Sequence, residues 1–437
     1  MIQVLKGHIV QTPVLGRLEI TENGYLVLQD GVIAGVYHTL PDGYGDAPLL
    51  DYGDKLIMQS FADMHLHAPQ YPMLGMGMDL PLLDWLNTYT FPTESRFADP
   101  DYARRTYRRL ASDLITNGTT RVCMFSSLHT EATWILMEEL ERAGVTGYVG
   151  KVNMDRNGLP GVLQETTEES VRETLRWLEG CHFAHVKPII TPRFTPSCTD
   201  ELMAELGRIA REKGLYVQSH LSESLGEIEW VRQLHPECQR YWETYDKYGL
   251  WKDHTLMAHC VHSDAAERKA IRDANVVVVH CGDSNVNICS GVCPVRRMLD
   301  EGLWVTLGSD IAGGAQLPMY KVIATSIRTS KVRRISDDWQ TDFLTVAEGY
   351  YLGTTSGHRY FGSGAGFAVG DPLHAIVVDD GDFPEASHPL NVEERFERII
   401  YMTHRHNIVS VWSDGREVVR RGNTPEDVSF AVQPRVR

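Results

Sequence analysis

The sequence predicts an α/β protein: a (β/α)8, TIM-like barrel in the middle of the chain and a small β-sandwich domain built from both ends. Residues 61–365 alternate short apolar runs with amphipathic helical stretches, which is typical of parallel strands joined by helices. Residues 1–60 and 366–437 instead carry short alternating strands and tight turns. A parallel α/β region of roughly 300 residues has the size of one barrel. A doubly wound sheet is the alternative that the same pattern allows.

The N-terminal region reads as a series of hairpins. Residues 16–38 alternate apolar and polar side chains around Asn23-Gly24 and Asp30-Gly31, dipeptides that tolerate positive φ. The C-terminal region has the same texture, with Asp414-Gly415 as its turn. We therefore expect the two ends of the chain to form one β-domain beside the central region.

The predicted strands of the central region are short apolar runs. They comprise residues 119–125, 147–153, 185–192, 215–223, 254–262, 274–282 and 303–310. Between them lie helical stretches such as residues 199–214 and 263–274, in which apolar residues recur three or four positions apart. No GxGxxG or P-loop motif follows any of these runs, so the sequence gives no support to a nucleotide-binding fold.

Composition excludes several classes of function. Lys plus Arg number 42 and Asp plus Glu number 58, which gives a formal charge of −16. Because nucleic-acid binding is driven by basic side chains that displace counterions, we expect no nucleic-acid partner. No apolar run reaches the ~20 residues that cross a bilayer, and no secretory leader is visible. The eight cysteines form no CxxC pair. We expect reduced thiols in a soluble, cytoplasmic protein without a membrane partner.

Metal-binding side chains follow several of the predicted strands. His65 and His67 lie one residue apart and share a face of an extended segment. His220 and Asp310 each end a later strand, and the carboxyl ends of barrel strands meet on one face. Three imidazoles and a carboxylate suit Zn²⁺ with a water in the remaining position, and zinc lowers the pKa of such a water from ~15.7 to about 7. Glu223, just beyond His220, has the type and reach of a proton shuttle.

The ordered set HxH, His, His and Asp on alternating strand ends resembles the amidohydrolase superfamily. Within it, the chain is similar over nearly its whole length to the guanine-deaminating members. The specific motifs are HLHAPQY, DWLNTYTFPTE, TPRF, QSHLSE, MAHCVH and LGSDIAGG, in this order. The resemblance implies hydrolytic deamination of guanine to xanthine and ammonia, a small-molecule purine as partner, one zinc ion per chain and a homodimer.

The resemblance also implies roles for individual residues. It implies zinc on His65, His67, His220 and Asp310, with Asp310 also a base for the zinc water. Catalysis would fall to Glu223 as proton shuttle, His259 beside the zinc water, and Asp310. The positions matching purine contacts are Gln70, Arg193 and the Phe194 backbone, with His220 and Glu223 beside the substrate. An arginine that donates to a purine carbonyl oxygen would reject adenine, because the donor would lose its partner.

Other features of the sequence leave alternatives open. The segment HCGDSN, with Gly282 and Asp283, departs from the HCPNSN of relatives, so the pocket wall and the substrate breadth are open. Alternatives are a deaminase of 8-oxoguanine, an aminated pterin or a nucleoside, and a non-catalytic scaffold, which the intact ligand set disfavours. We expect His280 to be structural or to support the ligands, and Met73, Met76 and Met78 to pack at the barrel rim. Residues 80–94 are apolar and aromatic, and we expect them to close the pocket or the subunit interface.

Overall fold

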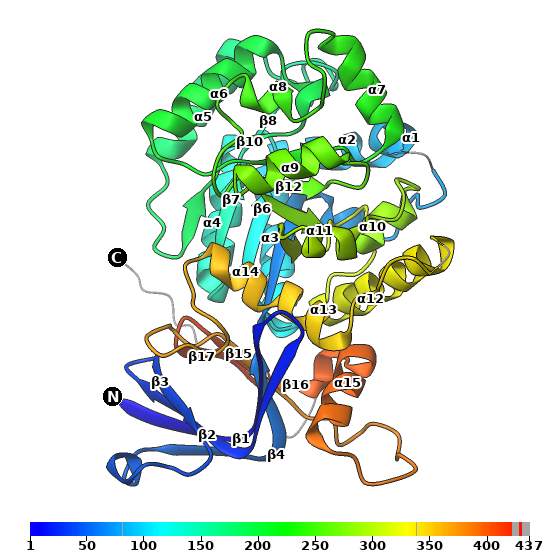
Figure 1. The fold of residues 1–437 in the computed structure, drawn as a ribbon. Coiled ribbons are helices and arrows are strands. Elements are labelled where there is room, and N and C mark those ends of the chain that lie inside the picture. The colour runs from blue at the N-terminus through cyan, green and yellow to red at the C-terminus, as the bar shows by residue number, and fades with distance from the viewer. Residues whose placement is uncertain (81, 338, 422–427, 431–437) are drawn as a thin grey trace.

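The computed structural model describes residues 1–80, 82–337, 339–421 and 428–430. Figure 1 shows the strands of the central region with helices around them, and below them a β-sheet built from the two chain ends. This arrangement confirms the predicted α/β class. No helix in the described part of the chain combines the length and the apolar character needed to span a membrane.

The two ends of the chain contribute to one sheet. Its eight strands run in the order β18-β17-β16-β15-β4-β1-β2-β3. They are β1 (Ile2–Val14), β2 (Arg17–Gln29), β3 (Val32–Tyr37), β4 (Leu49–Gln59), β15 (Ala375–Val378), β16 (Ile408–Ser413), β17 (Arg416–Arg421) and β18 (Val428–Phe430). The N-terminal and C-terminal strands meet where β4 pairs antiparallel with β15. Side chains from both halves, Leu5, Ile57, Val377 and Trp412 among them, share one small core.

Of the three hairpin turns that the sequence predicts in this sheet, two are present and one is not. Asp30-Gly31 joins β2 to β3, and Asp414-Gly415 joins β16 to β17. The hairpin expected at Asn23-Gly24 is wrong, because β1 and β2 pair along their lengths around Leu15-Gly16. Asn23, with φ of 48°, instead lies at a register shift within β2. A β-bulge needs the same positive φ as a tight turn, so the dipeptide alone does not separate the two.

Eight parallel strands form the ring that carries the site. They are β5 (Phe61–His67), β6 (Thr119–Phe125), β7 (Thr146–Gly150), β9 (Val186–Pro188), β11 (Gln218–Leu221), β12 (Leu256–His259), β13 (Val277–His280) and β14 (Trp304–Leu307). Two four-stranded sheets, β5-β6-β7-β9 and β11-β12-β13-β14, make its halves. A bridge between Ile190 and Val217 joins them on one side. On the other side the Asp310 N–H donates to the His65 carbonyl at 2.8 Å, which closes the ring.

Two predicted strands are interrupted. Residues 185–192 divide into β9 and the short β10 (Thr191–Pro192), which pairs with β8 (Val152–Asn153) instead of extending the ring. Residues 147–153 likewise divide into β7 and β8. Pro188 and Pro192 lack the N–H that a central strand must donate, which accounts for the first break.

Helices cover the outside of the ring. The longer ones are α3 (Pro100–Thr116), α4 (Thr130–Ala143), α5 (Thr167–Glu179), α6 (Asp200–Glu212), α7 (Leu225–Leu234), α9 (Ala265–Asp273), α12 (Met319–Ser336) and α13 (Val346–Gly353). A further helix, α15 (Val392–Met402), packs against α12 beside the sheet from the chain ends (Figure 1). Their starts follow local chemistry: α3 begins after the capping carboxylate of Asp99 with Pro100 in its first turn, and Thr166 and Glu169 form a capping box at α5. Their apolar faces join the ring strands in the main core.

Candidate active site

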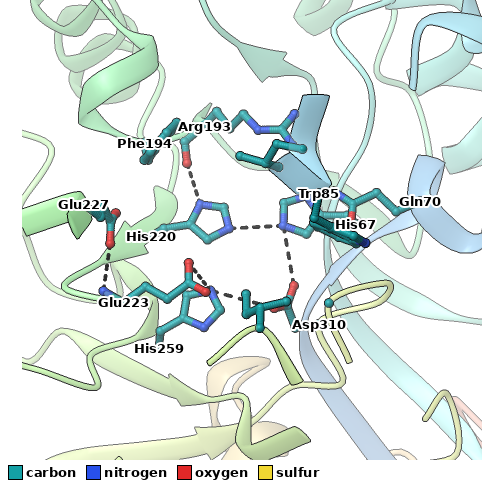
Figure 2. Close-up of a pocket in the computed structure, with 13 residues that line it drawn as sticks. His67, Gln70, Trp85, Arg193, Phe194, His220, Glu223, Glu227, His259 and Asp310 are labelled. Carbon is teal, nitrogen blue, oxygen red and sulfur yellow. Dashed lines mark hydrogen bonds and ion pairs between the residues drawn. The ribbon is translucent and has the colours of Figure 1, made fainter. Parts of the chain in front are cut away.

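The metal-binding side chains predicted from the sequence lie at one end of the ring. β5 carries His65 and His67, β11 carries His220, and Asp310 follows β14. Each of these residues is buried, with 2–8% of its surface exposed. Nε2 of His67 lies 3.1 Å from Nε2 of His220. Oδ1 of Asp310 lies 3.3 Å from Nε2 of His65 and 3.6 Å from Nε2 of His67. Residues far apart in the sequence therefore meet at one point, as Figure 2 shows for His67, His220 and Asp310.

These donor atoms fit a divalent metal ion. Ligand atoms about 2.0–2.1 Å from zinc at tetrahedral angles lie roughly 3.3–3.4 Å from one another, and the separations in this site are 3.1–3.6 Å. Nδ1 of His220 donates to the Arg193 carbonyl at 2.6 Å, so Nε2 of His220 offers its lone pair to the site. Nε2 of His65 has no hydrogen-bond partner among the described residues. A cation is the group that would satisfy these converging lone pairs.

The electrostatics of the site agree with this donor set. Burial lowers the pKa of His65, and burial together with neighbouring histidines lowers the pKa values of His67 and His220 well below the ordinary value. Burial alone would raise the pKa of Asp310, but the close approach and attraction of His65, with further attraction from His259 and His67, hold that pKa well below its usual range. Neutral imidazoles and an ionised carboxylate are the forms in which these groups bind metals.

Glu223 and His259 approach the same point from another side of the cavity (Figure 2). Oε2 of Glu223 lies 3.5 Å from Nε2 of His259, and Oε1 accepts a hydrogen bond from Ser290 at 3.0 Å. Nδ1 of His259 faces Oδ1 of Asn285 at 2.9 Å, which fixes the ring. Burial and repulsion from Asp310 outweigh the attraction of His259 and raise the pKa of Glu223. A buried carboxyl group of raised pKa beside a histidine is suited to carry a proton.

The backbone is left-handed at several of these strand ends. The φ angle is 47° at Ser222, 73° at His259, 51° at Cys260 and 46° at Asp310. Such a conformation costs on the order of 1–3 kcal/mol for a non-glycine residue, so the surrounding packing and hydrogen bonds must compensate. Strain of this kind concentrates at active sites and supports the placement of the site at this end of the ring.

Another side of the cavity presents hydrogen-bond donors. The two terminal nitrogens of Arg193, which follows β10, donate to the carboxylate of Glu94 at 2.6 and 3.0 Å. Nε2 of Gln70 donates to the same carboxylate at 2.9 Å, and its Oε1 accepts from the Ala312 N–H at 3.0 Å. Phe194 lines the cavity with Arg193 and Gln70. The Arg193 side chain is only 5% exposed, so a surface salt bridge does not explain it.

Residues 80–94 help to close this cavity, as the sequence predicts. Residues 82–94 form short helical turns that include α1 (Leu82–Trp85) and lead into α2 (Phe91–Ser95), and Trp85 and Leu86 line the cavity wall. Glu94 belongs to the same stretch, yet sequence reasoning gives it no role. Its only signal is an acidic residue inside an apolar, aromatic segment.

Other supporting residues were also missed. In the HCGDSN segment, α10 (Gly282–Asn287) places Ser284 to donate to Oδ2 of Asp310 and Asn285 to hold His259. This segment therefore orients site residues rather than only shaping a wall. Glu227 accepts from the Glu223 N–H at 2.9 Å and from the Tyr241 hydroxyl at 2.7 Å. Burial, with repulsion from Glu223, raises the pKa of Glu227 to about 7.

The remaining sequence candidates lie outside the ligand set. His280 ends β13, is 1% exposed, and has no hydrogen-bond partner at either ring nitrogen among the described residues. Burial lowers its pKa to about 4, which is consistent with a neutral structural residue. Met73 and Met78 pack against the main core, whereas Met76 is 45% exposed. The eight cysteines are free thiols, as expected.

Comparison with known proteins agrees with this geometry. The model of the amidohydrolase family matches residues 56–418, most of the chain. The chain belongs to the amidohydrolase family. A guanine deaminase from Dictyostelium discoideum is 35% identical to this amidohydrolase, over 96% of this chain and 98% of that protein. A guanine deaminase from Mus musculus is 37% identical, over 84% of this chain and 83% of that protein.

A solved structure is similar along almost the whole of this amidohydrolase. It is the crystal structure of a guanine deaminase from C. acetobutylicum with bound guanine in the active site. The TM-score is 0.92 at 42% identity, with 95% of this chain and 100% of that chain covered. The resemblance inferred from the sequence motifs is therefore confirmed. At this site of the amidohydrolase, the potential metal ligands form two overlapping groups that share His65. One group adds His67 and His220, the other adds His259 and Asp310, and the ligand atoms of each group lie within 4.8 Å of one another.

Proposed function

We propose that this amidohydrolase is a zinc-dependent guanine deaminase that converts guanine and water to xanthine and ammonia. One observation carries the proposal. A single cavity holds His67, His220 and Asp310 of the ligand set on one side and the donors of Arg193 and Gln70 on another. The named relatives and the guanine-bound structure of similar fold support the choice of guanine.

We assign the metal to His65, His67, His220 and Asp310, one ion per chain. Their separations and lone-pair directions support this assignment. Bound there, zinc would supply a water of lowered pKa beside the ring carbon that carries the amine. Ser284 donates to Oδ2 of Asp310 and so steadies this carboxylate, leaving Oδ1 toward the histidines.

The proton transfers fall to three residues. Asp310 accepts a proton from the attacking water, and Glu223 delivers a proton to N3 of guanine as C2 adds oxygen. His259, held by Asn285, donates toward the new oxygen, and the pKa of His259 is raised because Glu223 and Asp310 outweigh the lowering effect of burial. Electrostatic stabilisation of this kind is worth a few kcal/mol per donor. Glu223, now ionised, accepts the proton of the new C2 hydroxyl group and passes it to the amino nitrogen, so that the C2–N bond breaks, ammonia leaves and the C2 carbonyl forms. The proton that Asp310 took from the water then returns Glu223 to its protonated form.

Substrate orientation falls to Gln70, Arg193 and the Phe194 backbone. Arg193 and Gln70 each keep N–H groups beyond those given to Glu94, and these can donate to acceptors of an oxopurine ring. Phe194 continues the wall next to Arg193, and His220 and Glu223 border the reacting end of the ring.

The division of the chain is part of the proposal. We propose a barrel domain of residues 61–365 and a β-sandwich domain of residues 1–60 and 366–437. The eight-stranded ring and the shared core of the terminal strands support this division. The homodimer and the cytoplasmic location stay predictions of the sequence.

The direct test is incubation of the purified protein with guanine, with xanthine and ammonia as readouts and metal analysis in parallel. We expect one equivalent of xanthine per ammonia and close to one zinc per chain. A parallel panel of 8-oxoguanine, an aminated pterin and guanosine separates the related deaminases. Turnover of one of these without turnover of guanine would replace the proposed substrate, and a folded protein inert toward all of them would favour a scaffold.

A further inference from the structure

Glu94 is the buried anion of the donor side of the cavity. It is 2% exposed, and three hydrogen bonds reach its carboxylate: two from Arg193 at 2.6 and 3.0 Å and one from Gln70 at 2.9 Å. Arg193 lies 99 residues after Glu94 in the sequence and Gln70 lies 24 residues before it, so only the tertiary fold brings these three side chains together. The ring of Phe91, three residues before Glu94, lies 5.5 Å from the guanidinium carbon of Arg193.

This carboxylate fixes which atoms Gln70 presents. The Gln70 amide is anchored at both ends, because Oε1 accepts from the Ala312 N–H at 3.0 Å and Nε2 donates to Glu94. A flipped amide would point its NH₂ group at the Ala312 N–H and its oxygen at the carboxylate, and both contacts would be repulsive. The hydrogen that Gln70 has left is therefore an N–H donor.

The same carboxylate controls Arg193. Bidentate pairing uses one hydrogen on each terminal nitrogen and leaves the others as donors, and an arginine has no acceptor to offer. The pair also neutralises the buried charge, since an unpaired guanidinium at 5% exposure would be strongly destabilising. The Arg193 carbonyl meanwhile accepts from Nδ1 of His220, so the backbone of this residue also orients a proposed metal ligand.

We propose that Glu94 is a specificity-determining positioning residue: it holds Gln70 and Arg193 as a donor-only edge that selects ring edges rich in acceptors, as in 6-oxopurines, over edges that carry an amino donor. This role of Glu94 deepens the proposed function, and it rests on that proposal because it takes the cavity to be the purine-binding site. A purine with an exocyclic amine on that edge would place its own N–H donors against the N–H donors of Gln70 and Arg193, and no hydrogen bond could form between them. Sites built this way reject the mismatched analogue because their buried donors lose partners.

Hypoxanthine and adenine test the inference without turnover at C2. They differ at C6, where one has an oxygen and the other an amine, and neither has the 2-amino group that the proposed reaction removes. Equilibrium binding of both is measured by calorimetry on zinc-loaded, full-length protein, in the wild type and in Glu94→Gln. We expect the wild type to favour hypoxanthine by about 100-fold or more, and Glu94→Gln to reduce this preference at least about tenfold.

Glu139→Gln is the matched control. Glu139 is also 2% exposed and also pairs with arginines, Arg104 and Arg108, but on α4 away from the cavity. We expect this variant to keep the wild-type preference even where its melting temperature falls. Zinc content and thermal unfolding are measured for each variant, so that loss of folding is not mistaken for loss of discrimination.

If Glu94→Gln does not fold, Glu94→Asp takes its place, because it keeps the charge and withdraws the carboxylate by one methylene. A reduced preference in either folded variant supports the proposal. An unchanged preference, or a wild type that binds adenine as well as hypoxanthine, overturns it. Failure of the proposed function is a separate result: the wild type would then yield no xanthine from guanine, whatever its preference between the two probe rings.

Discussion

The role of Glu223 gives the sharpest prediction about catalysis. Glutamine at this position has nearly the same shape and can still accept from Ser290, which lies 3.0 Å from Oε1. It cannot exchange a proton with N3 of guanine or with the departing ammonia. General acid–base catalysis contributes about 10²–10⁴ in rate, which corresponds to about 2.7–5.5 kcal/mol of transition-state stabilisation. We expect kcat of Glu223→Gln to fall by this factor.

Stability and metal content separate this loss from general damage. Glu223 is 6% exposed and is repelled by Asp310, which together with burial raises its pKa, so removing its charge should leave the melting temperature unchanged or higher. Zinc should stay bound, since Glu223 is not a proposed ligand. The assay is xanthine formation under saturating guanine, with Glu139→Gln as the control that keeps kcat. Near-normal turnover by zinc-loaded Glu223→Gln would refute the assignment.

Three further predictions follow from contacts around the site. Asn285→Ala removes the acceptor 2.9 Å from Nδ1 of His259, and we expect kcat/KM to fall about tenfold with zinc retained; an unchanged value would mean that His259 needs no such support. Removing the metal with a chelator should lower the unfolding temperature and added zinc should restore it, because the site then loses its bound ion; equal melting curves would contradict the metal assignment. Glu227 has a pKa of about 7 in the folded protein against an ordinary value of 4.5, so the folded state holds the Glu227 proton more tightly than the unfolded state does. The stabilisation of the fold by this proton is fully present below pH ~4.5 and is lost as pH rises through about 7. Denaturant unfolding should therefore show Glu227→Gln gaining stability relative to the wild type between pH 5 and 8, on the order of 1–3 kcal/mol, and a constant difference would refute the shift.

The sequence by itself determined the parts of this protein that depend on local periodicity and on ordered motifs. Strands and helices of the central region follow from runs of apolar residues, and the strand period of two places His65 and His67 on the same face. His220 and Asp310 could be added because residues at the carboxyl ends of parallel strands meet. Each of these inferences needs only neighbours along the chain and one general rule of topology.

The tertiary structure alone decided how the chosen side chains are held. Glu94 gives no local signal that it will meet Arg193, and Asn285 gives none that it will orient His259, since these pairs form only when the strands and the helices that follow them pack together. The hairpin predicted at Asn23-Gly24 is wrong for the same reason. Whether a residue with positive φ lies in a hairpin turn or in a β-bulge depends on how far the partner strand β1 extends beside it. Hydrogen-bond partners are set by distances of about 3 Å, and sequence separation carries no information at that scale.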